Sequence, residues 1–88
     1  MKEETNWDDI SFIVSSSYRE RILKSLDKPK TPSKLSKDLG INKTHISRAL
    51  SELENKKMIE CLTPKAKKGR IYSITEYGKK VLNGYSKL

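Results

Sequence analysis

Residues 31–54 have the sequence TPSKLSKDLGINKTHISRALSELE, which contains the start signals of two helices on either side of a glycine. Thr31 followed by Pro32 predicts an N-cap and the first position of a short helix, where the missing proline N–H costs nothing. Gly40 suits the left-handed residue that ends this helix, and Asn42 offers the N-cap of the next one. We therefore expect two helices joined by a tight turn, which is the spacing of a helix-turn-helix.

Apolar periodicity and cap signals predict further elements on both sides of this stretch. The second helix is expected to begin with a capping box formed by Ser17 and Glu20, and Thr75 is expected to cap the last helix. We expect a single mainly α, α+β domain over residues 1–88, with a three-helix core, a two-stranded β-hairpin wing and a C-terminal helix. Its expected elements are a short helix over 8–15, a helix over 17–26, the helix-turn-helix over 31–56, the wing over 58–74 and the last helix over 75–86.

This order of elements is that of a winged helix-turn-helix domain, and two strings resemble known regulators. Residues 31–54 are similar to the core of the MarR and ArsR-type transcription regulators. Residues 70–82, RIYSITEYGKKVL, resemble the string with which many such regulators, including small archaeal ones, leave the wing. The resemblance implies a sequence-specific regulator that binds double-stranded DNA. In many relatives a glycine ends the recognition helix where this chain has Lys57, and because a left-handed non-glycine residue costs about 1 kcal/mol we expect this helix to end differently.

The outward face of the second helix of the motif enters the DNA major groove in this family. Arg48 is our first choice for base readout, because arginine can bind guanine O6 and N7 with two hydrogen bonds. The alternative is that Arg48 is only a solvated helix residue. The candidates that the resemblance implies on this helix are Lys43, Thr44, His45, Ser47, Arg48 and Ser51.

Two further groups of residues are candidates for contact with DNA phosphates. The start of the first helix of the motif offers backbone N–H groups and hydroxyls to an anion, although its cap residue can serve the helix alone. The basic run at the wing tip suits the DNA backbone or minor groove, the alternative being a solubilising turn. These residues are Thr31, Ser33 and Lys34 at the helix start, and Lys65, Lys67, Lys68 and Arg70 on the wing.

The charge distribution supports a polyanion as partner. The chain has 19 Lys and Arg against 11 Asp and Glu, a net charge of +8. Four of the acids precede Ile10, so that 18 bases and 7 acids follow, a net charge of +11. Such an excess is typical of nucleic-acid binding, although a lysine-rich solvated surface has the same composition.

Other classes of function lack the residues they need. No nucleophile, base and orienting group recur in a recognisable arrangement and no phosphate-binding glycine loop is present, so we expect no enzyme, cofactor or small-molecule ligand. Cys61 and His45 alone cannot form a metal site. The single cysteine and the lack of a signal peptide or membrane span predict a cytoplasmic protein, bound to the nucleoid when on DNA. The competing hypothesis is a winged-helix module that binds protein within a transcription or other nucleic-acid-handling complex.

Apolar residues near the two ends of the chain predict a homodimer assembled through the terminal helices. They exceed what so small a core needs, and exposed apolar stripes usually find partners. These residues are Trp7, Ile10 and Phe12 at one end and Leu82 and Tyr85 at the other. The tyrosines fall on or beside apolar stripes and are expected in the core, namely Tyr18, Tyr72, Tyr77 and Tyr85.

Overall fold

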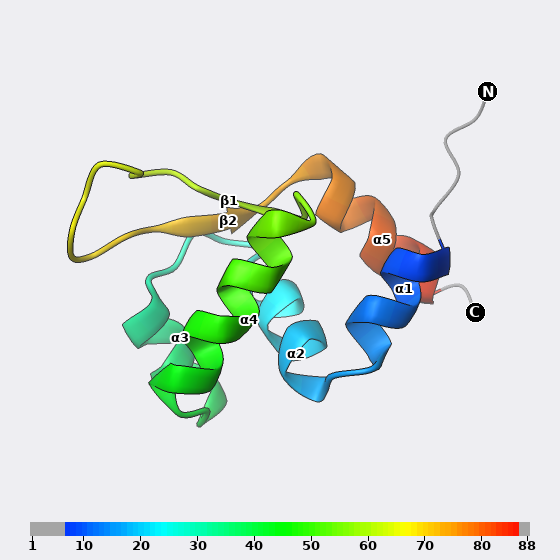
Figure 1. Ribbon diagram of the computed structural model, residues 1–88, viewed down its shortest axis with the longest axis horizontal. Helices are drawn as coiled ribbons and strands as arrows, with labels where there is room; N and C mark the ends of the chain where they lie inside the picture. The colour runs from blue at the N-terminus through cyan, green and yellow to red at the C-terminus, as the bar shows by residue number, and fades with distance from the viewer. Residues whose placement is uncertain (1–6, 87–88) are drawn as a thin grey trace.

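The computed structural model describes residues 7–86, without the side chains of the last two of them. Its elements are α1 (Trp7–Val14), α2 (Ser17–Ser25), α3 (Pro32–Leu39), α4 (Lys43–Asn55), β1 (Ile59–Cys61), β2 (Tyr72–Ile74) and α5 (Glu76–Ser86). The two strands form an antiparallel hairpin that projects from one end of the helical body, while α1 and α5 lie together at the other end (Figure 1). The predicted mainly α winged helix-turn-helix fold is confirmed.

The caps of the helix-turn-helix are those that the sequence predicts. Thr31 is extended and its hydroxyl accepts a hydrogen bond of 3.2 Å from the backbone N–H of Lys34. Gly40 has a φ of 66°, in the left-handed region that favours glycine. The side-chain oxygen of Asn42 accepts a bond of 2.9 Å from the N–H of Thr44. Each cap satisfies a backbone group that the end of a helix leaves unpaired.

The capping box predicted for α2 is wrong by one residue. Ser16 is the N-cap, with an extended backbone and a hydroxyl 3.4 Å from the N–H of Arg19. The third helical position is therefore Arg19 and not Glu20, which forms an ion pair of 2.9 Å with Lys24 one turn further on. The serine triplet 15–17 offers three possible caps. Which of them caps α2 depends on where α1 ends and on the direction of the chain between the two helices.

The end of α4 also differs from our expectation, because Lys57 does adopt the left-handed conformation, with a φ of 62°. The N–H of Met58 bonds the carbonyl of Leu53 at 3.0 Å and the N–H of Lys57 bonds that of Glu54 at 2.9 Å, which is the Schellman motif. Met58 and Leu53 are both fully buried. The hydroxyl of Thr75 donates to the carbonyl of Lys57 at 2.8 Å. These contacts offset the cost of a left-handed lysine.

Replacing Lys57 with glycine should therefore stabilise the protein. A side chain in the left-handed region costs about 1–2 kcal/mol, which glycine would relieve. Glycine also makes the unfolded chain more flexible, and this reduces the gain in stability. We therefore expect the free energy of unfolding to rise by about 1 kcal/mol. Urea unfolding measures the change. Lys56→Gly is the matched control: its φ is −87°, so glycine there should give no gain. A loss of stability in Lys57→Gly would show that the left-handed backbone of Lys57 is not strained.

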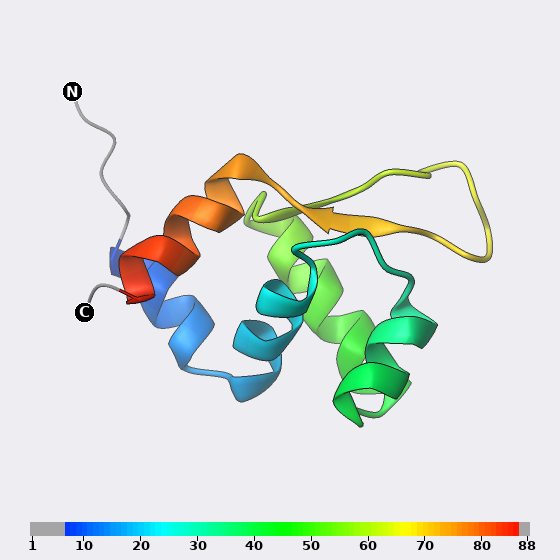
Figure 2. The same cartoon turned by 180° about the vertical axis from the view of Figure 1, so that it is seen from behind.

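The wing is tied to the rest of the fold at its base. β1 and β2 pair from Ile59 opposite Ile74 to Cys61 opposite Tyr72. The backbone of Lys30, just before α3, exchanges hydrogen bonds of 3.0 and 2.9 Å with Tyr72, so a third segment runs beside β2 (Figure 2). The base of the wing and the start of the helix-turn-helix are thus held by the same ladder.

Burial corrects two expectations about apolar residues. Ile10 is only 4% exposed and belongs to the core, so it cannot contribute to an exposed apolar surface, whereas Trp7 is 64% exposed. Phe12 and Leu82 are partly buried against the core, and the side chain of Tyr85 lies outside the described residues. Among the other tyrosines, Tyr72 is buried and Tyr77 partly buried, but Tyr18 is 37% exposed and the prediction that placed it in the core is wrong.

A buried carboxylate that the sequence does not reveal joins three helices. Asp9 in α1 accepts a hydrogen bond from the hydroxyl of Tyr77 in α5. Its other oxygen lies 3.5 Å from Nζ of Lys56 at the end of α4. Desolvation, together with the Asp9 carboxylate, raises the pKa of Tyr77 to about 12. Both effects favour the protonated hydroxyl, which is the form that donates to Asp9.

Candidate nucleic-acid interface

The exposed face of α4 carries all six candidates on this helix. Ile46, Ala49, Leu50 and Leu53 turn into the core, which leaves the opposite face to solvent. That face and its flanks hold Lys43, Thr44, His45, Ser47, Arg48 and Ser51, every one of them exposed. A helix docked through this face would present an ammonium, a guanidinium, an imidazole and three hydroxyls to a ligand.

The start of α3 places Ser33 and Lys34 in solvent and leaves Thr31 half buried as the cap. Nζ of Lys34 lies 3.3 Å from the carboxylate of Asp38, and Nζ of Lys30 lies 3.5 Å from the other oxygen of the same group. Desolvation acts against ionisation of Asp38, but the two ammonium groups prevail and lower its pKa. The ammonium of Lys34 is thus already paired with the carboxylate of Asp38, a contact that the sequence analysis did not predict.

The wing lysines and Arg70 differ in their surroundings. Lys65, Lys67 and Lys68 are exposed, and within residues 7–86 no ion pair engages them. Arg70 is exposed as well, but its Nε donates to the carbonyl of Ala66 at 3.1 Å and its Nη2 to that of Pro64 at 3.2 Å. The guanidinium of Arg70 therefore closes the wing loop and keeps only its remaining donors for a ligand.

Three predicted groups that are far apart in the sequence meet in one groove, which we call the wing groove. It has a volume of about 430 Å³ and lies between the starts of α3 and α4 and the wing tip. Its walls are residues 31–33, Lys43 and residues 67–70. Four of these side chains are cationic and none is acidic. The groove is therefore suited to a polyanion.

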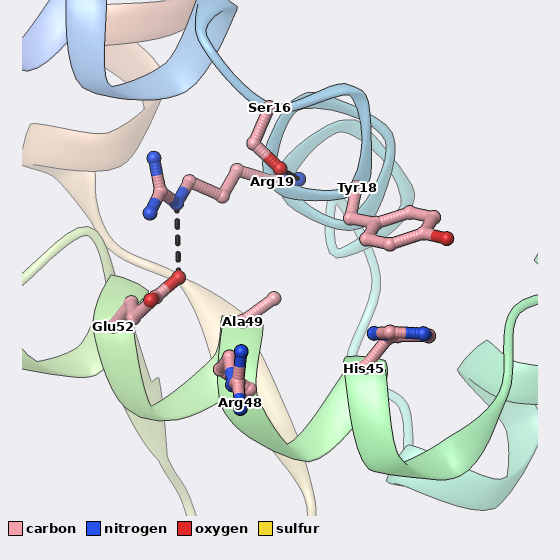
Figure 3. Close-up of a pocket in the computed structure, with 7 residues that line it drawn as sticks. All are labelled: Ser16, Tyr18, Arg19, His45, Arg48, Ala49 and Glu52. Carbon is pink, nitrogen blue, oxygen red and sulfur yellow. Dashed lines mark hydrogen bonds and ion pairs between the residues drawn. The ribbon is translucent and has the colours of Figure 1, made fainter.

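A second hollow of about 250 Å³, which we call the α2–α4 hollow, lies between the two helices of that name (Figure 3). The ring centroids of Tyr18 and His45 are 4.9 Å apart at its edge. Nε of Arg19 lies 3.0 Å from the carboxylate of Glu52 on its wall. Sequence reasoning missed Tyr18 because its position beside the apolar stripe of α2 favours burial, and only the packing of α2 against α4 brings it next to His45.

The part of the chain that the structure describes has neither a membrane-spanning helix nor a group of metal ligands. Across residues 7–86, no helix is both long and apolar enough to span a membrane. Within the same residues, no three His, Cys, Asp or Glu side chains are grouped so that they could hold a metal ion.

Comparison with solved structures gives MarR-family winged-helix transcription regulators, including archaeal ones. A MarR family transcription regulator superposes with a TM-score of 0.71 at 25% identity, over 82% of this chain and 50% of the other. The reduced form of the transcriptional regulator YodB from B. subtilis gives a TM-score of 0.77 at 18% identity, over 98% and 87% of the two chains. The transcriptional regulator BldR from Sulfolobus solfataricus gives a TM-score of 0.72 at 20% identity, over 91% of this chain and 63% of the other. Several of these relatives are longer, and this chain spans about half the length of the first.

No curated protein matches this chain. The similarity to MarR-type regulators that residues 31–54 and 70–82 indicate is confirmed by the solved structures. A family model, that of the HVO_A0261 N-terminal domain, matches residues 7–88, which is nearly the whole sequence. The chain therefore belongs to the HVO_A0261 N-terminal domain family, with the winged-helix fold of the MarR-type regulators.

Proposed function

We propose that this chain is a sequence-specific transcriptional regulator of the cytoplasm that binds double-stranded DNA as a single domain over residues 1–88. In this proposal α4 enters the major groove and the wing follows the backbone or the adjacent minor groove. The wing groove is the observation that carries the proposal. It joins the helix start, the first residue of α4 and the wing into one cationic surface beside the exposed face of α4.

The candidate residues then divide by the part of DNA that they contact. Arg48 is in the middle of the exposed face of α4 and is assigned to a base edge, with Thr44 and Ser51 one turn to either side. Phosphate contacts are assigned to the lysines of the wing and to the walls of the wing groove. Lys34 would share its ammonium between a phosphate and Asp38.

The test compares a preferred duplex, obtained by selecting bound fragments from random DNA, with a duplex of random sequence. Arg48→Ala should weaken binding to the preferred duplex by about 1–3 kcal/mol and binding to random DNA much less, because only the preferred sequence offers the base that Arg48 contacts. Fluorescence anisotropy measures both affinities. Wild-type thermal unfolding of the variant excludes misfolding as the cause.

Two results would contradict this assignment. If Arg48→Ala lowers both affinities by the same factor, Arg48 contacts a phosphate and the major-groove assignment is wrong. If the wild-type protein does not bind duplex DNA at low salt, the hypothesis of a protein-binding winged-helix module takes its place.

The exposed side chains of α1 support a homodimer assembled through the terminal helices. Trp7 and Val14 are exposed large apolar residues of α1, which packs against α5. We expect sedimentation at micromolar concentration to show a dimer, and Trp7→Ala to shift the equilibrium toward monomer. A two-fold dimer would require inverted half-sites about one helical turn apart. A purely monomeric species, with and without DNA, would overturn the dimer.

A further inference from the structure

The recognition face of α4 lies between two hollows. In both views of the fold α2 is on one side of α4, while α3 and the wing are on the other (Figures 1 and 2). The wing groove belongs to the second side and the α2–α4 hollow to the first. A helix in the major groove has a sugar–phosphate strand on each side, because the groove is only about 12 Å wide. The two hollows therefore correspond to the two strands of one groove.

The α2–α4 hollow holds hydrogen-bond donors at its mouth. Tyr18 and His45 are exposed and lie side by side, and Arg48 also lines the hollow (Figure 3). A phenol, an imidazole and a guanidinium can all donate to a phosphate oxygen. Tyr18 comes from α2, so the hollow extends beyond the helix-turn-helix that the sequence indicates.

The one carboxylate of the hollow is neutralised by a fixed partner. Glu52 would repel a phosphate, but Nε of Arg19 lies 3.0 Å from its Oε1. Arg19 is held in turn by a bond of 2.9 Å from its Nη1 to the carbonyl of Phe12, and its guanidinium carbon lies 3.9 Å from the centre of the Phe12 ring. Arg19 is thus the counter-ion of Glu52. Because Arg48 is assigned to a base edge, the donors left for an incoming anion are those of Tyr18 and His45.

We propose that the outer edge of the α2–α4 hollow, at Tyr18 and His45, binds a backbone phosphate of the DNA strand opposite to the strand that follows the wing groove. The hydroxyl of Tyr18 donates to this phosphate, and the ring of Tyr18 keeps the imidazole of His45 directed toward it. This inference rests on the proposed binding of duplex DNA and adds Tyr18 to the residues that contact DNA.

The first experiment uses Tyr18→Phe, which removes the hydroxyl and keeps the ring. Loss of a hydrogen bond to a charged group should weaken binding to preferred and random duplexes alike, by about tenfold. The salt dependence should stay that of the wild type, because a neutral donor releases no counterion. Ser11→Ala, which removes a hydroxyl from an exposed residue of α1, is the control and should bind as the wild type does.

The second experiment locates the phosphate. A series of duplexes, each with one neutral methylphosphonate in place of a phosphate, is bound by wild type, by Tyr18→Phe and by Lys67→Gln. At one position the wild type should lose about tenfold while Tyr18→Phe loses clearly less, because this variant has already lost the Tyr18 hydrogen bond to that phosphate and keeps only its contact with His45. Lys67→Gln should show the same insensitivity only at positions on the other strand.

Several results would overturn the inference without affecting the proposed function. One is wild-type binding by Tyr18→Phe, and another is a loss restricted to the preferred duplex, which would mean a base contact. The inference also fails if no methylphosphonate is coupled to Tyr18, or if the coupled one is on the strand that Lys67 contacts. Failure of the proposed function is distinct, because it is seen in the wild-type protein before any variant is made.

Discussion

Gly78→Ala is expected to destabilise the protein by about 3 kcal/mol, the largest effect that we expect of any single methyl group in this chain. A Cβ at Gly78 would lie 2.2 Å from the carbonyl oxygen of Met58 and 2.8 Å from Cγ1 of Ile74. The carbonyl cannot move aside cheaply, because it accepts a bond of 3.0 Å from the N–H of Thr75. The first turn of α5 therefore has to move away from Met58, which lies in the turn between α4 and β1.

Urea unfolding measures this loss, and Asn83→Ala is its control. Asn83 is an exposed residue of the same helix, so alanine there should raise helix propensity and leave the stability equal or slightly higher. Alanine at position 78 also has a higher helix propensity than the residue it replaces. The steric clash must therefore cost more than this gain if the variant is to be less stable. If Gly78→Ala unfolds at the same urea concentration as the wild type, α5 does not approach the turn as closely as the structure has it.

Replacing Lys65, Lys67 and Lys68 together with glutamine is expected to have the largest effect on DNA binding. These lysines are exposed at the wing tip, and a phosphate contact releases counterions but does not depend on sequence. Preferred and random duplexes should both be bound more weakly, by the same factor. The plot of log affinity against log salt should become flatter by about 0.9 for each phosphate that a bound protomer no longer neutralises.

The control for the wing variant is the exposed pair Lys79 and Lys80 on α5, replaced with glutamine. It reduces net charge but lies away from the wing groove, so it should change the salt dependence little. Thermal unfolding of both variants should equal that of the wild type, since surface substitutions usually shift stability by less than about 0.5 kcal/mol. A triple variant with reduced affinity only for the preferred duplex would contradict a backbone role of the wing.

The parts of the fold that the sequence predicts are those decided by local interactions. Thr31, Gly40 and Asn42 each act within a few residues of the chain, so residue type and spacing are enough to place both helices of the motif. The choice of Ser16 over Ser17 as the cap of α2 is not local, because it depends on where α1 ends and on the direction in which the chain leaves it.

The features that the sequence does not predict depend on packing between distant segments. Lys57 is left-handed although it is not a glycine, and the hydroxyl of Thr75, 18 residues further along the chain, donates to its carbonyl. Tyr18 lies next to His45 because α2 packs against α4, and residue type alone favours the core for a tyrosine beside an apolar stripe. The candidate site could therefore be predicted as a list of residues but not as two hollows.

The hydrogen bonds between Lys30 and Tyr72 bear on how the domain would meet its ligand. They join the segment before α3 to β2, so the helix start and the base of the wing are already held together by backbone hydrogen bonds in the domain without a ligand. Association then loses little conformational entropy at these two places, and the cost of ordering falls on the loop of the wing tip and on long lysine side chains.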